Sequence, residues 1–393
     1  MKAKATDSSL KRRTFLMGMA GVSAAAQLST FASDQQPKIR IGVVGGGFGC
    51  SFYWHEHPNC TVTAVSDLRA DRRDRLVQTY KCDNVYESLE KMLLDDSLDA
   101  VAVFTGAPDH VRHCVEVMNS GRHVICAVPA ATSLEECQTL VDAVKRTGMT
   151  YMMAETSYYR QEAITARQWA QENKFGDIIL IETEYHHDMT HDGPALRYYE
   201  GKRTWRYGYP PMHYPTHSLA FVGGITGERL VTVSCIGYRG GDDVLDKDNA
   251  YNNPFSNATA FYKTDRGTPV RHSEFRHAAA GITERAQWYG TEMSFFMPTP
   301  NGTSATICYR GKQPEMFDQP QYWKTDMLPE PLRHNSGHGG SHTFLTHEFI
   351  TALLEKRKPA VDVYAAVSYT APGIVAHQSA LKDGEQLTIP DFG

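Results

Sequence analysis

The chain has 393 residues, a length that predicts two domains, and 41% of its residues are apolar, which is enough to bury a core in each. Lys and Arg number 40 against 45 Asp and Glu, so the formal net charge is -5. This balance argues against the strongly basic composition of nucleic-acid-binding proteins, and a small molecule is the expected partner.

Residues 1–35 are typical of an export signal. Arg12–Arg13 is followed by Phe15–Leu16 and an Ala- and Gly-rich apolar stretch, as in a twin-arginine signal, although Lys11 replaces the usual Ser or Thr. A basic tail without structure is the alternative. We expect a periplasmic or extracellular protein, and no stable membrane span because the apolar stretch is short.

Between residues 36 and 155, short apolar runs alternate with helical patterns. The runs KIRIGVV, CTVTAVSD, LDAVAVFTG, HVICAVP and TYMMAE are expected strands. In the third helical pattern, Ser133 and Glu136 form a candidate capping box and Gly148 is the expected end of the helix. This order predicts an α/β domain with a doubly wound parallel sheet.

The first expected strand ends in a glycine-rich turn that is typical of dinucleotide binding. Gly45, Gly47 and Cys50 fill the G-x-G-x-x-G/A frame, in which amides at the start of the next helix face a pyrophosphate. Asp67 closes the second strand, where an acid binds the ribose hydroxyls. An acid at this position favours NAD, while the arginines that follow it keep NADP open.

From residue 156 to residue 393 the pattern changes. Runs such as DIILIETEYHH and RLVTVSCIGYRG alternate with period two, and long loops rich in Tyr, His and Gly separate them. Helical patterns flank these strands, beginning near Gln161 and ending with two late amphipathic segments. We expect an α+β domain with an open, mainly antiparallel sheet.

Four motifs together resemble the Gfo/Idh/MocA oxidoreductase superfamily. They are the Gly45 turn, APDHVRH, GRHVICAVP and YPTHSL, and they span nearly the whole chain after its export signal. The resemblance implies a Rossmann domain, a substrate domain whose sheet supports dimer or tetramer contacts, and a nicotinamide cofactor. The implied cofactor-binding residues are Gly45, Gly47, Phe48, Asp67, Arg69, Thr105, Pro108, His110 and Pro129.

The chain departs from the superfamily pattern at two positions. The Glu-Lys-Pro of the dehydrogenases is Ala127-Val128-Pro129, and the Asp of the D-x-G-x-H motif is Tyr214, although the His remains as His217. Segments such as YMMAETSYYR and FGDIILIETEYHHD resemble the exported NAD-dependent glycosidases, including the α-N-acetylgalactosaminidase group. That resemblance implies Tyr159 and His217 as the acid–base groups, with Tyr158 competing for the tyrosine role.

Three functions stay open from the sequence. They are net sugar dehydrogenation, redox-neutral glycoside cleavage through oxidation, elimination, addition and reduction, and non-catalytic binding of a nucleotide or sugar. The aromatic and basic loop at residues 197–217 suits a sugar, with an oligomer interface as the alternative. The expected substrate-binding residues are Tyr158, His187, Trp205, Arg206, Tyr214 and His338.

Two histidine motifs bear on a metal site. His186 and His187 are neighbours on an expected strand and point to opposite faces, so we expect no metal there. His338 and His342 lie four residues apart, and Gly339 and Gly340 between them predict a turn rather than a continuous helix.

Overall fold

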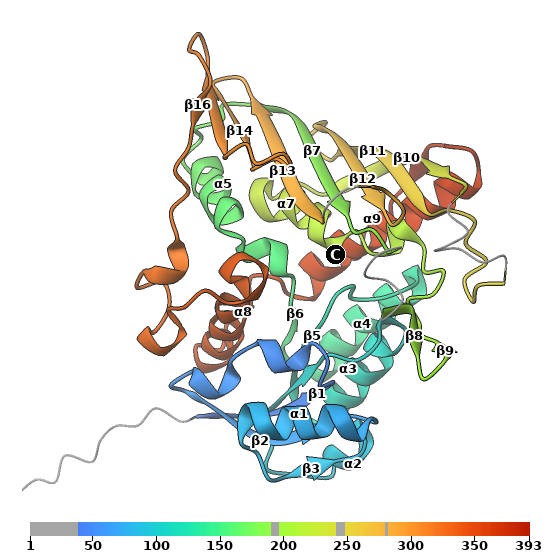
Figure 1. Cartoon of the computed structure of the whole chain (residues 1–393), viewed down its shortest axis with the longest axis vertical. Helices are drawn as coiled ribbons and strands as arrows, with labels where there is room; N and C mark the ends of the chain where they lie inside the picture. The colour runs from blue at the N-terminus through green and yellow to red at the C-terminus, as the bar shows by residue number, and fades with distance from the viewer. Residues whose placement is uncertain (1–37, 190–195, 241–247, 280–281) are drawn as a thin grey trace, which may run out of the picture. The chain divides into compact units, whose positions relative to one another are not determined.

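The computed structural model describes residues 38–189, 196–240, 248–279 and 282–393, and residues 37–393 form one compact unit (Figure 1). The expected export signal lies outside the described residues. The unit contains a six-stranded sheet, a nine-stranded sheet and a two-stranded hairpin. The domain boundary that the sequence predicts near residue 155 lies where the last strand of the six-stranded sheet leads into a short 3-10 helix.

The six-stranded sheet is parallel throughout, as the sequence predicts. Its strands lie in the order β3 (Val85–Tyr86), β2 (Cys60–Ser66), β1 (Ile39–Val44), β4 (Ala100–Val103), β5 (His123–Cys126) and β6 (Tyr151–Met153). The strand order reverses between β1 and β4, so the carboxyl ends of these two strands border the ligand crevice of a doubly wound sheet.

Four helices cover this sheet, and the sequence predicts all of them except the short α2. They are α1 (Ala70–Tyr80), α2 (Leu89–Met92), α3 (His110–Asn119) and α4 (Leu134–Thr147). The Ser133 side chain accepts a hydrogen bond from the Glu136 amide at 3.1 Å, and Gly148 ends α4 with a φ of 69°. The Glu136 carboxylate accepts from Thr132 instead of completing the capping box.

The expected helix after the glycine-rich turn is absent as a regular helix. Two single-turn 3-10 helices, η1 (Gly49–Ser51) and η2 (Trp54–Glu56), take its place, and Tyr53 between them has a φ of 56°. Helix α8 (Gly337–Leu354) covers this face of the sheet instead. The Phe52 ring stacks on His342 at 4.7 Å, and apolar α8 residues share one buried cluster with β1.

The nine-stranded sheet is antiparallel except for one parallel pair, β12 with β7. The strands are β16 (Glu315–Met316), β15 (Thr306–Tyr309), β14 (Met293–Phe296), β13 (Thr283–Gly290), β7 (Ile178–His186), β12 (Pro269–Phe275), β11 (Asn257–Thr264), β10 (Leu230–Tyr238) and β17 (Leu387–Thr388). Along β7, buried and partly exposed residues alternate, which confirms the predicted period of two.

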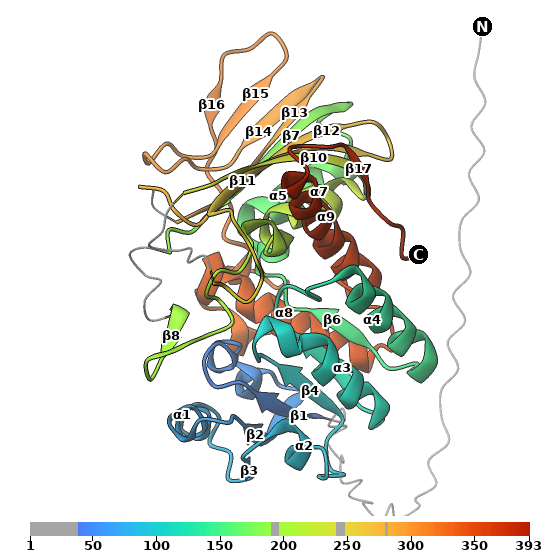
Figure 2. The same cartoon turned by 90° about the vertical axis from the view of Figure 1, so that its right-hand side faces the viewer.

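Helices α5 (Gln161–Gln171), α7 (Thr216–Thr226) and α9 (Val363–Leu381) lie against one face of the nine-stranded sheet (Figure 2). Helix α9 contacts both β10 and β6 and so joins the two sheets. The remaining short elements are η3 (Ala107–Asp109), η4 (Thr156–Tyr159), η5 (Pro211–His213), η6 (Tyr322–Lys324), η7 (Glu330–Leu332) and the hairpin of β8 (Tyr198–Tyr199) and β9 (Lys202–Arg203).

All eight cysteines are free, and six of them are buried, as expected from their apolar surroundings. Within the described residues, no helix combines the length and the apolar character that a membrane span needs.

Candidate active site

The glycine-rich turn after β1 leaves no room for side chains at Gly45 and Gly46. A Cβ on Gly45 would lie 2.2 Å from the carbonyl oxygen of Phe104, and Gly45 also has a φ of 99°. A Cβ on Gly46 would lie 2.3 Å from the carbonyl oxygen of Arg72. A turn this close to β4 and α1 fits the approach of a pyrophosphate, so these residues suit a dinucleotide. The Arg72 guanidinium lies next to Gly47, where its positive charge suits the negative charge of a pyrophosphate.

The end of β2 fits an adenosine ribose. The buried Asp67 carboxylate accepts hydrogen bonds from the amides of Gly46 and Arg69, each at 2.8 Å. The Arg69 guanidinium is paired with Asp71 at 2.7 Å and lies 3.4 Å from the ring centre of Tyr199. Arg69 is therefore already neutralised, which agrees with NAD rather than a cofactor with an extra phosphate.

Other expected cofactor residues surround the same crevice. The Phe48 ring lies between Phe52 and Phe104, at 5.0 and 5.7 Å, and the Thr105 hydroxyl lies 2.9 Å from His113. Pro108 lies within η3, at the carboxyl end of β4.

His110 requires a correction. It is 1% exposed, and its ring nitrogens lie 2.7 Å and 3.1 Å from the carbonyl oxygens of Pro129 and Thr105. Both nitrogens are therefore occupied by the backbone. His110 fixes the two loops at the crevice and has no ring nitrogen left for a ligand.

His217 lies in the first turn of α7 and is paired with Glu155, which follows β6 in the chain. Its Nδ1 lies 2.7 Å from Oε1 of Glu155, and both side chains are buried. Burial opposes the charged imidazole. The charge and hydrogen bond of Glu155, with Glu284 behind it, outweigh burial and raise the pKa of His217 to about 10. His217 is therefore an imidazolium at neutral pH.

A second buried carboxylate supports this pair. Glu284 on β13 accepts two hydrogen bonds from the Arg160 guanidinium, each at 2.6 Å, and one from the Ser157 hydroxyl. Burial raises the pKa of Glu284, but the charge of Arg160 outweighs it and lowers the pKa. Because the Ser157 amide also donates to Glu155 at 2.9 Å, the two carboxylates form one network around His217.

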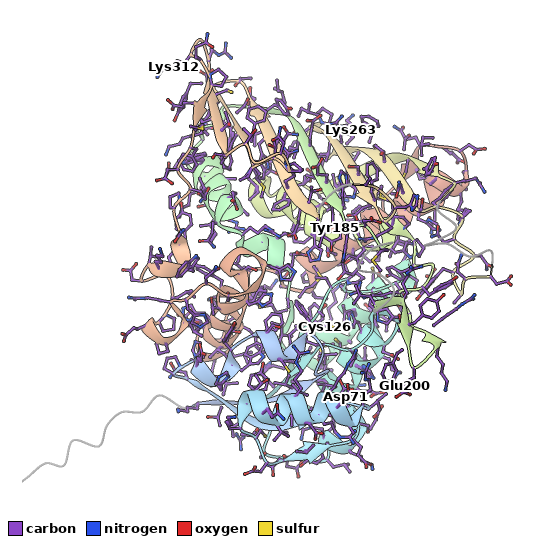
Figure 3. All side chains as sticks on the ribbon, viewed as in Figure 1. Asp71, Cys126, Tyr185, Glu200, Lys263 and Lys312 are labelled. Carbon is purple, nitrogen blue, oxygen red and sulfur yellow. The ribbon has the colours of Figure 1, made fainter. Side chains whose placement is uncertain are left out.

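Two tyrosine rings face His217. The ring centres of Tyr185 and Tyr214 lie 5.0 Å and 5.3 Å from that of His217. Figure 3 shows Tyr185 at the end of β7 nearest the parallel sheet. The guanidinium of Arg276 lies about equally close to both rings, at 5.0 and 5.3 Å.

The two phenols differ in acidity. Burial raises the pKa of Tyr185. Burial also opposes ionisation of Tyr214, but the positive charges of Arg206 and His217 outweigh it and lower the pKa of Tyr214 below its usual value. Of the two phenols, Tyr214 is therefore the one that loses its proton more readily.

The expected pairing of Tyr159 with His217 is corrected by these contacts. The Tyr159 ring stacks on Phe344 at 5.5 Å with the planes 6° apart, and burial raises its pKa well above the usual value. Tyr158, the expected competitor, lies under the Arg167 guanidinium at 3.7 Å and packs against Gly224. Both rings fill the space between α5, α7 and α8. Burial of their large apolar area stabilises them there.

Two further expected residues do reach the site. The Tyr185 hydroxyl lies 3.2 Å from Nδ1 of His187, and the His338 ring lies 6.4 Å from that of His217. His186 contacts Ser273 and stacks on Phe275, which confirms that it points away from His187. His338 and the two glycines after it have positive φ angles, which confirms the predicted turn.

A pocket opens beside Tyr214. The residues lining it include Arg197, Trp205, Arg206, Tyr214, Ser256 and Arg276. The Trp205 ring lies directly on the backbone at Gly106, where a Cβ would approach it to 2.8 Å. The expected substrate residues Trp205, Arg206 and Tyr214 therefore meet between the carboxyl end of β4 and the second sheet. Across the described residues, no cluster of three or more His, Cys, Asp or Glu side chains suits a metal ion.

Sequence reasoning missed Glu155, Tyr185 and the Arg160–Glu284 pair. Glu155 follows β6 at the carboxyl edge of the parallel sheet, and that position is a usable signal. Tyr185 shares a strand face with His187, two residues away, which is also a signal. Arg160 and Glu284 are 124 residues apart in the chain, and no local pattern connects them.

Comparison with known proteins agrees with this geometry. Residues 39–155 match the Gfo/Idh/MocA oxidoreductase family with its NAD-binding Rossmann fold, and residues 309–393 match the C-terminal domain of glycosyl hydrolase family 109. The first of these domains is of the Gfo/Idh/MocA oxidoreductase family. The chain is an enzyme of the oxidoreductase fold, and its Rossmann domain is NAD-binding.

Similar proteins align with almost the whole chain. A glycosyl hydrolase family 109 protein of Streptomyces coelicolor is 25% identical over 99% of this chain and 88% of its own length. An alpha-N-acetylgalactosaminidase of Tannerella forsythia is 23% identical over 94% and 89%. The fold is shared with a levoglucosan dehydrogenase solved with NADH and levoglucosan, with a TM-score of 0.75, 15% identity, and coverage of 90% and 100%.

Proposed function

We propose that the chain is an NAD-dependent enzyme acting on a carbohydrate, and that its reaction is redox-neutral cleavage of a glycoside. The observation that carries the proposal is the His217 imidazolium, held on Glu155 and facing two tyrosines next to the cofactor crevice. The match of residues 309–393 to a glycosidase domain supports glycoside cleavage over net dehydrogenation.

Each proton transfer is assigned to a residue of the site. When bound, NAD would supply reversible hydride transfer with a sugar carbinol. The phenol of Tyr214 accepts the carbinol proton, because the positive charges of Arg206 and His217 lower its pKa despite burial. Glu155 occupies Nδ1 of His217, which leaves Nε2–H to protonate the departing aglycone. The C–H proton next to the oxidised carbon, which leaves in the same elimination, goes to Tyr185, whose hydroxyl lies 3.2 Å from Nδ1 of His187. Val128, at the place of the dehydrogenase lysine, is buried in the core and takes no part in proton transfer.

Net dehydrogenation of a sugar is the second candidate, because the structural relative above is a sugar dehydrogenase. A single screen separates the candidates. Purified protein is tested for NAD content by mass spectrometry and then incubated with aryl glycosides and free sugars. Release of aglycone without net NADH supports the proposal, and NADH accumulation with a sugar supports the dehydrogenase. Ligand-induced stabilisation without turnover would mean that the chain only binds.

We further propose export through the twin-arginine signal of residues 1–35 and assembly of copies through the outer face of the nine-stranded sheet. Three large side chains on the adjacent strands β10 and β11 are exposed to solvent: Ile236 (61%), Tyr238 (60%) and Phe261 (61%). A cluster of exposed apolar side chains is typical of a surface that contacts another protein. Cell fractionation tests the first proposal. Light scattering of the wild type and of Phe261→Lys tests the second, and an unchanged mass contradicts it.

A further inference from the structure

The pocket beside Tyr214 has an unusual charge. The guanidinium groups of Arg206 and Arg276 line it, and the lining residues that the structure describes include no Asp or Glu. A concave site with charges of one sign attracts the opposite sign.

Arg276 lies between the pocket and a buried carboxyl. The side chain of Arg276 is 12% exposed, and its guanidinium lies 3.4 Å from Oε2 of the fully buried Glu274. Burial raises the pKa of Glu274 well above its usual value despite that guanidinium, which favours the neutral carboxyl. The second guanidinium, Arg206, lies 4.4 Å from the Trp205 ring and thus contributes its charge over an aromatic wall.

Ser256 adds an unused donor. It is 1% exposed and lines the same pocket, and its hydroxyl has no hydrogen-bond partner among the described residues. A buried hydroxyl without a partner costs free energy. An oxygen-rich anion would satisfy it together with the arginines.

A neutral sugar fits this pocket less well than an anionic one. Sugar hydroxyls accept hydrogen bonds from guanidinium groups but leave their charge uncompensated, whereas a carboxylate or sulfate matches the planar fork of Arg with two charge-assisted bonds. Trp205 and Tyr214 supply apolar ring faces on which a sugar ring stacks.

We propose that the substrate is an anionic sugar whose carboxylate or sulfate group is bound by Arg206, Arg276 and Ser256. This inference rests on the proposed carbohydrate function and gives it a substrate class. The pocket adjoins Tyr214, so the anion lies on the substrate side of the proton-transfer groups and not at the cofactor phosphates.

Calorimetry of the NAD-loaded protein tests the proposal with matched probes. These are glucose and glucuronate, galactose and galacturonate, glucose 6-sulfate, and tartrate as an anion that is not a sugar. At least one anionic sugar should bind about 10-fold or more tightly than its neutral partner, and 0.5 M NaCl should reduce this ratio, as is typical of charge-assisted recognition.

Variants identify the residue that causes the preference for an anionic sugar. Arg206→Gln should bring the ratio of the two affinities to about one, and Arg206→Lys should restore part of it because the charge returns. Arg203→Gln is the matched control, since Arg203 lies on the same loop but over the Tyr207 ring. It should leave the ratio unchanged.

The outcomes separate the two proposals. Turnover of neutral glycosides without any preference for anions would overturn the anionic substrate and leave the glycosidase function standing. Binding of tartrate that depends on Arg206, with no sugar bound, would support the anion pocket and overturn the carbohydrate function. Absence of binding by every anionic probe would overturn the anion pocket.

Discussion

Two buried histidine–glutamate pairs lie among the described residues, and the pKa of the histidine is shifted in opposite directions in the two pairs. His217 and Glu155 are 2.7 Å apart, and the pKa of the histidine is raised to about 10. His272 and Glu274, both fully buried on β12, are 3.4 Å apart, and the pKa of that histidine is lowered to about 3.

Their surroundings explain the difference. Burial opposes charge in both pairs. Around His217, the second carboxylate of Glu284 adds to the attraction of Glu155, whereas His272 has His186 and Arg276 as its charged or chargeable neighbours. A histidine next to a glutamate is thus an ion pair only where further groups favour it. The first pair can supply a proton, and the second is a neutral part of the core.

The largest expected effect is on catalysis by His217. We expect His217→Ala to reduce kcat by about 10²-fold or more on a verified substrate, the usual scale for a lost acid–base group. NAD content, measured by mass spectrometry, should not change, because His217 is not part of the Gly45 turn.

The matched change in the other pair is His272→Ala. It should lower the thermal unfolding temperature because it leaves a cavity, but it should keep kcat within about threefold. Equal losses of kcat in the two variants would remove the distinction between the pairs.

Replacing Glu155 tests the cause of the raised pKa. In Glu155→Gln, the pKa of His217 should fall by about 1–3 units, since one full opposing charge is removed. The alkaline limb of the pH–kcat profile should move down by the same amount, and NMR titration of the imidazole should report it directly. Glu274→Gln is the control. Its profile should match the wild type, because burial raises the pKa of Glu274 and so favours a neutral carboxyl that resembles the amide.

The tyrosines give the next effect. Tyr185→Phe and Tyr214→Phe should each reduce kcat by about 10²-fold, while Tyr159→Phe should stay within about threefold, because the Tyr159 ring packs on Phe344. Steady-state kinetics of the three variants decides this. A large loss in Tyr159→Phe alone would restore the pairing expected from the sequence.

The smallest effect is on stability, where the two histidines should have opposite signs. The folded pKa of His217 exceeds 6.5, so its contribution is complete below pH 6.5 and is lost as the pH rises toward 10. The folded pKa of His272 lies below 6.5, so its contribution is complete above pH 6.5 and is lost as the pH falls toward 3. Each slope should approach about 1.4 kcal/mol per pH unit, measured by urea unfolding against His217→Gln and His272→Gln.

Much of the fold could be predicted from the sequence because its signals are local. The strand ending at Gly45, the acid at Asp67 and the cap of α4 each depend on residues close together in the chain. The second sheet could be predicted as mainly antiparallel from its period of two. The missing first helix could not, because α8, almost 300 residues later, supplies the apolar side chains that cover that face.

The sequence by itself determined the dinucleotide turn, the loss of the lysine at Val128 and the presence of His217. Only the tertiary structure decided what His217 does. Its charge depends on Glu155 and Glu284, which are 62 and 67 positions away, and on burial that excludes water from all three groups. The roles of the tyrosines likewise could not be read from local sequence patterns. Which phenol faces His217 follows from how β7 and α7 pack, and no spacing in the chain records that packing.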